Sequence, residues 1–513
     1  MILVKPFRQS TLPWLLAGGV AFFFAYLSHR IDFHPDEAIY FDAVQLSVRN
    51  DAGLFYSAFY LSIGHFLPGP VGARFASALL GGATFLLLVR TFVLTQNFSS
   101  ARIALLFATF VLSYQSIFVF VRVRPEAAWW FCGALVLYAM TWFEIESRDT
   151  IRAGSLLALL LAIIMLPMNH RLSWFACAFV GGYALLFLLR EKGWRIVGII
   201  CLSLFSGLIL NIVLRAWLAD IPLQAAFATA LDGSGGQRQS VKAFLDLVFH
   251  GAPLFLNDTA QNPNLYEWIS GSKMRALSHA FVQNVLWLLL LVLPLFGRSW
   301  KERYVFAFPA FALFAFWASG YYNPTYSAGF SLFCVLALVY SIPGISGWRG
   351  KLAVCILSVT MVNGLSFIST RILNHGHASF FAAEIKIRRL AENLSSGQKL
   401  AVPERFMSVY SGLPVHHFVN FKTDIPADVD LLVTDSYDLL MYGFVPDFEA
   451  KKLALVELAK TLCIEDQILV PVYENDDLWG ETVAKTLDKP ASWFFRNSAA
   501  YVLNIYRKCE LKR

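Results

Sequence analysis

Charged residues are scarce in this chain: Asp, Glu, Lys and Arg together make up 15% of it, against about a quarter in a typical soluble protein. Hydrophobic residues make up 57%, with 46 Phe and 14 Trp among the 513 residues. This composition excludes an ordinary soluble protein and predicts a polytopic membrane protein with many α-helices. The formal net charge of +7 does not indicate nucleic-acid binding, because the basic residues occur in short clusters between apolar runs.

Cysteine is also sparse, with seven residues and no Cys-x-x-Cys pair, which excludes a cysteine-rich metal site. Most of these cysteines lie inside apolar runs, where cysteine acts as a small buried hydrophobe. Cys463 and Cys509 lie beyond the last apolar run. In an oxidising compartment they would form a disulfide, and the alternative is two separately buried thiols.

Apolar runs long enough to cross the ~30 Å hydrocarbon core predict about eleven transmembrane helices. The first run is expected to remain as a membrane anchor, because no signal-peptidase site follows it. Alternate loops are rich in Lys and Arg, which predicts that they are cytoplasmic and that the C-terminal tail lies outside. The predicted spans are 12–28, 71–94, 103–121, 127–143, 153–168, 172–189, 196–218, 278–297, 304–319, 326–343 and 352–369.

The composition becomes that of a soluble protein near residue 373, so the chain divides into a transmembrane module, 1–372, and a C-terminal domain, 373–513. Within the module, 29–70 is predicted to be an outer loop with surface helices, and 219–277 a long outer loop. Helical spacing occurs at 384–394 and 450–462, and short apolar runs typical of strands occur at 399–402, 430–434 and 500–506. These patterns predict an extracytoplasmic α/β domain.

Two adjacent carboxylates, Asp36 and Glu37, follow the first apolar run in the sequence His34-Pro-Asp-Glu37. Proline suits the first turn of a helix, so both carboxylates would lie at the positive end of the helix dipole and stay ionised. They are candidates for acid–base chemistry at the membrane surface. The alternative is that they only cap a surface helix.

Other predicted outer segments carry cations and phenols. Arg122, Arg124 and Glu126 form a short charged loop between two spans, and ionised residues belong at a wet rim rather than at the bilayer centre. Simpler interpretations are arginines that reach lipid phosphates, an ordinary helix end at His170, and an interfacial belt of tyrosines. The remaining candidates are His170, Arg171, Arg238, Lys242, His250, Tyr322 and Tyr326.

These features together resemble the GT-C superfamily of membrane glycosyltransferases: a carboxylate pair after the first span, the run from Gly72 to Gly82 that opens the second, and the Arg/acid loop before the fourth. The chain is most similar in layout to bacterial protein O-mannosyltransferase-like enzymes and to lipid A aminoarabinose transferases. It departs from these groups in having Glu126 where Asp is common and in lacking a Glu-Pro-Trp-His-Tyr type of run. The absence of a Trp-Trp-Asp-Tyr-Gly run argues against an oligosaccharyltransferase.

The resemblance implies an inverting enzyme of the bacterial inner membrane, with its active site and C-terminal domain facing the periplasm. It would move a sugar from a polyprenyl-phosphate donor to lipopolysaccharide, lipid A or another envelope glycan, or alternatively to a protein. Asp36 would be the base, and Glu37 would orient the acceptor or bind a divalent cation together with His250. Glu126 and Tyr322 would orient the acceptor. The donor phosphate would be held by Arg122, Arg124, His170, Arg171, Arg238, Lys242 and Tyr326.

A lipid or glycolipid flippase is the alternative from another class, because it too would have many spans. Transporters of that kind are expected to bury ionisable residues within their spans and to show repeated halves. In this sequence the charges gather at one rim and no internal repeat is evident. A non-catalytic scaffold or receptor is the third option. Substituting Asp36 with Asn would separate these alternatives, because a transferase should lose turnover while folding normally and a scaffold should be unaffected.

Overall fold

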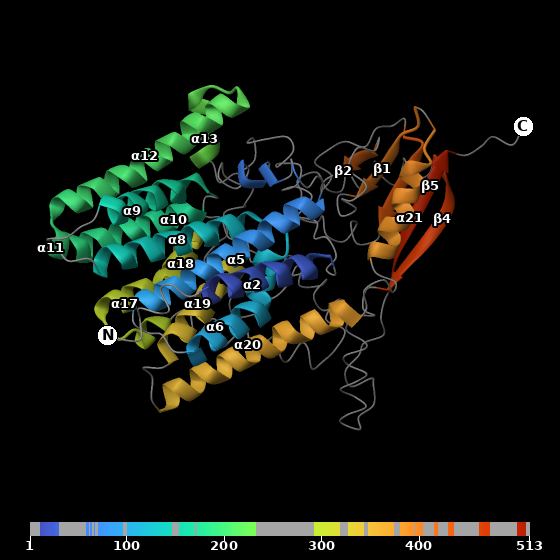
Figure 1. The fold of residues 1–513 in the computed structure, drawn as a ribbon. Helices are drawn as coiled ribbons and strands as arrows, with labels where there is room; N and C mark the ends of the chain where they lie inside the picture. The colour runs from blue at the N-terminus through green and yellow to red at the C-terminus, as the bar shows by residue number, and fades with distance from the viewer. Residues whose placement is uncertain are drawn as a thin grey trace, which may run out of the picture.

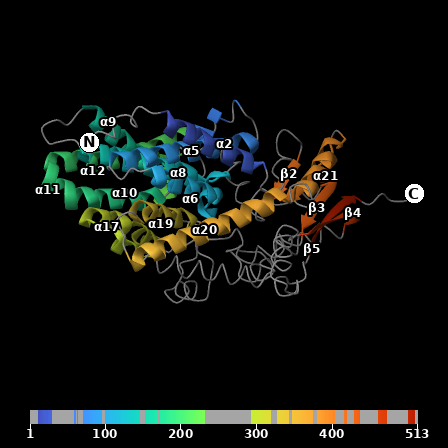
Figure 2. The ribbon, with the colours of Figure 1, turned by 60° about the horizontal axis from the view of Figure 1, so that its bottom comes forward.

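The computed structural model shows a bundle of long helices with a small sheet beyond one end (Figure 1). Both views place the sheet at the end where the long helix α20 (Trp348–Leu373) finishes (Figure 2). The structure describes residues 11–29, 58–60, 62–63, 66, 70–95, 100–145, 153–169, 172–231, 292–318, 327–342, 347–373, 380–395, 397–403, 415–418, 429–435, 461–471 and 500–508.

Helices follow the predicted apolar runs closely. In the described part of the chain, four are long and apolar enough to cross a membrane: Gly72–Leu94, Pro125–Ile145, Ser173–Lys192 and Trp194–Trp217. The chain is thus an integral membrane protein by its helices. The helices of the bundle are α2 (Leu12–Ser28), α5 (Pro70–Leu94), α6 (Ser100–Leu112), α7 (Tyr114–Phe120), α8 (Pro125–Ile145), α9 (Ala153–Met165), α10 (Leu172–Tyr183), α11 (Leu189–Lys192), α12 (Trp194–Ala219), α13 (Leu223–Leu231), α17 (Trp300–Phe306), α18 (Phe308–Ala318), α19 (Ser327–Ser341) and α20.

The predicted spans therefore coincide with helices at ten places, whereas most of the run 278–297 lies outside the described residues. Several of these helices are shorter than a full span: α2, the α9 segment and the described part of α19 fall in that class. The total of eleven spans stays a prediction. Of the predicted outer loop 219–277, the structure describes α13, and the surface helices of 29–70 lie mostly outside the described residues.

Helices α2 and α5 pack closely because small residues face each other. A Cβ on Gly82 would lie 2.7 Å from the carbonyl oxygen of Ala17 and 2.9 Å from the Cβ of Ala21. Within a membrane, such close approach supplies the van der Waals contact that holds helices together. Beside this contact, the buried rings of Phe24 and Phe120 stack at 5.8 Å. This packing fixes the position of α5, which carries the buried Arg74 near its start.

The predicted span 103–121 is bent rather than straight. Its two halves, α6 and α7, meet at Ser113 with an angle of 63°. The Ser113 side chain caps α7 by accepting a hydrogen bond from the backbone N–H of Ser116 at 3.3 Å. Gly364 of α20 packs against the break, and a Cβ there would overlap the carbonyl oxygen of Leu112.

The C-terminal part forms a five-stranded sheet in the order β2-β1-β3-β5-β4. Strand β1 (Leu400–Pro403) pairs in parallel with β2 (Val415–Phe418) and β3 (Leu431–Asp435). Strand β5 (Ala500–Lys508) pairs antiparallel with β3 and with β4 (Leu462–Pro471). Helix α21 (Phe380–Glu392) packs on the sheet, where Lys386 forms an ion pair with Asp466 of β4.

The predicted strands at 399–402, 430–434 and 500–506 and the helix at 384–394 are confirmed as β1, β3, β5 and α21. One boundary was wrong: the helix predicted to end at Leu462 does not include that residue, which begins β4. Cys463 therefore lies in a strand, where it is disulfide-bonded. Cys509 lies outside the described residues.

Candidate active site

Three buried arginines mark the end of the bundle that faces the sheet. The exposed fraction is 1% for Arg74 on α5, 5% for Arg122 and 0% for Arg124. The last two lie in the short connection between α7 and α8. An ionised side chain within a membrane is costly and is normally paired and functional. Their environment therefore defines the candidate site.

Arg124 forms a bidentate pair with Glu126. Its Nη2 donates to Glu126 Oε1 at 2.9 Å and its Nε donates to Oε2 at 3.2 Å. Both side chains are almost fully buried, with exposed fractions of 1% and 0%. Glu126 lies in the first turn of α8 just after Pro125, where the helix dipole favours a carboxylate. The two parallel hydrogen bonds hold the guanidinium plane in one orientation.

Phe118, on α7, lies beneath both neighbouring arginines. The guanidinium carbon of Arg124 is 4.6 Å from the centroid of this ring, and that of Arg122 is 5.4 Å away. Cation–π contacts of this kind gain strength where water is excluded. The shared ring places the two positive charges side by side at the tip of α7.

Hydrogen bonds hold the connection between α7 and α8 against α5. The Ser77 hydroxyl donates to the backbone carbonyl of Arg122 at 2.6 Å, and Tyr60 forms a hydrogen bond with the same hydroxyl. All of these groups are buried. One turn earlier on α5, Arg74 Nη1 donates to the carbonyl of Ser28 at 2.6 Å and so caps the end of α2. Arg74 therefore adjoins the start of the segment that carries Asp36 and Glu37.

A second polar group lies where α9, α10 and α12 meet. Asn211 of α12 donates to the Pro167 carbonyl at 3.0 Å and accepts from Arg215 Nε at 3.1 Å. Arg215 is 7% exposed. The side-chain oxygens of Asn169 and Ser173 are buried and have no hydrogen-bond partner among the described residues. This corner adjoins the predicted residues His170 and Arg171.

The structure places only part of the predicted site. Arg122, Arg124 and Glu126 come together as described. The other predicted residues lie outside the described ranges, so their roles stay predictions: Asp36, Glu37, His170, Arg171, Arg238, Lys242, His250, Tyr322 and Tyr326. Within those ranges no three His, Cys, Asp or Glu side chains are grouped so as to hold a metal ion. The proposed divalent cation, with Glu37 and His250 as ligands, is untested.

Sequence reasoning missed Arg74, Arg215, Ser77 and Tyr60 as members of the site. A signal existed for the two arginines, because each is a lone charge inside an apolar run. None existed for Ser77, whose partner is a backbone carbonyl 45 residues away, or for Tyr60, whose partner is the Ser77 hydroxyl.

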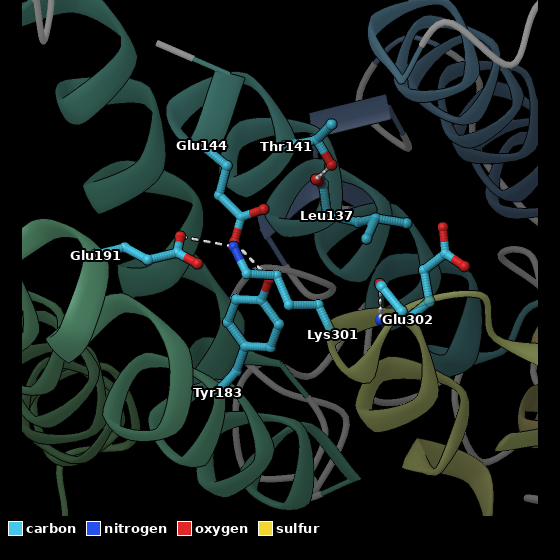
Figure 3. A network of polar contacts seen from close by, with 8 residues as sticks. Leu137, Thr141, Glu144, Tyr183, Glu191, Lys301 and Glu302 are labelled. Carbon is cyan, nitrogen blue, oxygen red and sulfur yellow. Dashed lines mark hydrogen bonds and ion pairs between the residues drawn. The ribbon is translucent and has the colours of Figure 1, made fainter. Parts of the chain in front are cut away.

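A different network occupies the opposite end of the bundle (Figure 3). Lys301 of α17 lies 2.7 Å from Glu191 Oε2 and 3.5 Å from Glu144 Oε1. The Tyr183 hydroxyl donates to the same oxygen of Glu144. This network joins α8, α10, α11 and α17 around a single ammonium group.

The fold combines apolar helices, a buried charge cluster at one end of the bundle and a small mixed sheet beyond that end. The whole chain is similar to the crystal structure of ArnT from Cupriavidus metallidurans, which has undecaprenyl phosphate bound. The similarity covers 97% of this chain and 98% of that one, with a TM-score of 0.52 and 13% sequence identity. No protein-family model and no curated protein sequence matches the chain.

Proposed function

We propose that this chain is an inverting glycosyltransferase that takes a sugar from a polyprenyl-phosphate donor. Its acceptor would lie on the outer face of the bacterial inner membrane and would be lipopolysaccharide, lipid A or another envelope glycan. Two findings support this: the apolar helices place the chain in a membrane, and ArnT, whose fold it shares, binds undecaprenyl phosphate. The resemblance of the sequence to lipid A aminoarabinose transferases favours a glycolipid acceptor.

The observation that carries the proposal is the adjacent pair of buried cations, Arg122 and Arg124. Guanidinium groups recognise phosphate oxygens with paired hydrogen bonds, and such bonds strengthen where water is excluded. These two arginines are therefore the proposed holders of the phosphate as it leaves.

The proposed chemistry assigns the base to Asp36. The acceptor oxygen attacks the anomeric carbon of the sugar while its proton passes to Asp36. The bond between that carbon and the phosphate oxygen breaks, and polyprenyl phosphate leaves with the bonding electrons. Arg122 and Arg124 stabilise the charge that develops on it. Attack opposite the leaving group inverts the configuration.

The position of Asp36 in the chain supports its assignment as the base. The segment that holds Asp36 and Glu37 begins just beyond Ser28, whose carbonyl is bound by Arg74. Arg74 and Ser77 lie one turn apart on α5, and Ser77 in turn holds the backbone of Arg122. The carboxylate segment therefore starts from the same end of the bundle as the arginines. Glu37 would orient the acceptor or bind a divalent cation, and Glu126 and Tyr322 complete the proposed acceptor side.

A reconstituted assay tests the proposal. The purified chain in proteoliposomes would be given undecaprenyl-phosphate sugars together with lipid A, and product would be followed by mass spectrometry. Transfer that disappears in Asp36→Asn, with undecaprenyl phosphate still bound, supports the proposal. Movement of the lipid-linked sugar across the bilayer without transfer would instead identify a flippase. Transfer to a peptide but not to lipid A would identify the protein-glycosylating alternative.

A further inference from the structure

Exposed tryptophans gather at the end of the bundle opposite the buried arginines. Their exposed fractions are 59% for Trp14, 72% for Trp194, 77% for Trp300 and 68% for Trp348. Trp194, Trp300 and Trp348 are the first residues of α12, α17 and α20. Both views show the starts of these helices at the end away from the sheet (Figures 1 and 2).

Each of these tryptophans has an arginine over its ring. The distance from the guanidinium carbon to the ring centroid is 5.3 Å for Arg90 on Trp14 and 5.9 Å for Arg195 on Trp194. It is 5.5 Å for Arg303 on Trp300 and 5.8 Å for Arg349 on Trp348. We call these four pairs the Trp–Arg belt. Two of the pairs are neighbours in sequence and the Trp300–Arg303 pair spans one helical turn, whereas Arg90 and Trp14 come from different helices.

The carboxylates at this end are engaged elsewhere. Glu144 and Glu191 surround Lys301, and Glu302 accepts hydrogen bonds from the backbone N–H of Arg298 and from the Tyr340 hydroxyl. In the part of the chain that the structure describes, no carboxylate pairs with an arginine of the belt. Among the described residues, the positive charges of the belt therefore have no carboxylate partner.

The belt borders an apolar surface that suits lipid chains. On α12, Leu202, Phe205 and Ile209 are exposed between Trp194 and Trp217, which is 75% exposed. The two tryptophans are separated by about 35 Å along the helix axis at 1.5 Å per residue. This matches a ~30 Å hydrocarbon core with a tryptophan in each interface.

We propose that the Trp–Arg belt binds the phosphates of anionic phospholipids in one leaflet of the membrane. The indole would lie at headgroup depth, and the arginine that it supports would contact the lipid phosphate. The charge complementarity and the adjoining lipid-facing surface both favour an anionic phospholipid over a protein partner. This inference is independent of the proposed transferase activity.

Native mass spectrometry of the full-length chain in detergent tests whether the Trp–Arg belt binds anionic phospholipids. The chain would be incubated with phosphatidylglycerol or with phosphatidylcholine of the same acyl chains. Wild type should retain phosphatidylglycerol preferentially. Each arginine near an anionic surface contributes about fivefold to association, so combining Arg90→Gln, Arg195→Gln, Arg303→Gln and Arg349→Gln should abolish the preference.

A matched control removes charge away from the bundle, through Arg388→Gln and Arg389→Gln on α21. It should leave the lipid preference unchanged. If the fourfold variant does not fold, Arg195→Gln and Arg349→Gln are tested singly, and each should weaken phosphatidylglycerol retention about fivefold. Equal retention of the two lipids by wild type, or equal losses in the belt and control variants, would overturn the proposal.

Discussion

Glu126 accepts two hydrogen bonds from Arg124 inside a part of the bundle that solvent barely reaches. Removing one partner of a buried ion pair leaves the other charge without compensation, at a cost of about 3–5 kcal/mol. The pair therefore stabilises the fold and fixes the orientation of the Arg124 guanidinium.

Glu126→Ala should lower the thermal unfolding midpoint and raise the KM for the lipid-phosphate donor. Both effects follow because Arg124 would lose its orientation and its neutralising charge. The control is Glu392→Ala on α21, which breaks an exposed pair with Arg388 and should cost no more than about 0.5 kcal/mol. Similar unfolding midpoints in the two variants would show that the buried pair contributes no more to stability than the exposed pair.

Asp36→Asn should reduce the transfer rate on the order of 10²-fold or more while leaving donor binding nearly intact, because amide replaces the general base. Arg124→Ala should instead weaken binding of the donor. Steady-state kinetics with a lipid-phosphate sugar would measure both. Near-normal activity in the two variants would mean that the chemistry occurs elsewhere.

Fusion reporters can determine the orientation of the bundle. Reporters placed after Ser147 and Lys192 should read cytoplasmic, and those after Gly236 and Gln398 external, because the basic loops alternate. The Trp–Arg belt would then face the cytoplasm, where anionic lipids attract basic residues. A cytoplasmic reading at Gln398 would put the sheet on the wrong side for the proposed site.

Peptide mapping without reduction should recover Cys463 linked to Cys509. Cys463 is disulfide-bonded, and Cys132, Cys177, Cys201, Cys334 and Cys355 are free. Lys508, one residue before Cys509, pairs with Leu462, the neighbour of Cys463. Chain entropy predicts a contribution of roughly 3–4 kcal/mol for a loop of this size. Cys509 recovered as a freely alkylated peptide from oxidised membranes would contradict the prediction.

Acid should destabilise the sheet by protonating the Asp430 carboxylate. The hydrogen bond from Lys508, reinforced by the backbone N–H of Lys399, holds the pKa of this carboxyl below its ordinary value of 3.8. A lowered folded-state pKa stabilises the fold above pH 3.8, and that stability is lost as pH falls through the folded value. The protection of β3 and β5 amides against hydrogen exchange should therefore fall as the pH drops below 3.8. Asp430→Asn should flatten this dependence, and an unchanged slope would exclude the carboxyl as its source.

The sequence predicted most of the helices because their apolar runs have the length of a span. It did not predict the break at Ser113, although Ser113, Gln115 and Ser116 interrupt the apolar run there. The break depends on contact with Gly364 of α20, which the sequence does not reveal. Strand β4 was missed because acidic residues interrupt its apolar pattern at Glu465 and Asp466. Helix and strand are hard to tell apart in such short segments.

Within the site, the arginines of the α7–α8 loop were predicted because three charges occur there together. Their arrangement was not, because it depends on contacts between distant residues. Glu126 was expected to orient an acceptor, and the structure adds that both its oxygens bind Arg124. Arg74 reaches the carbonyl of Ser28 across 46 positions of sequence, a contact that only packing of α2 on α5 creates.

The contact of Gly364 with Leu112 has a mechanical consequence. Helix α7 carries Phe118, on which Arg122 and Arg124 rest, and α20 abuts the break from which α7 starts. The same helix α20 runs on toward the sheet (Figure 1). A shift of α20 at Gly364 would therefore move the start of α7 and, with it, the aromatic ring beneath the two arginines.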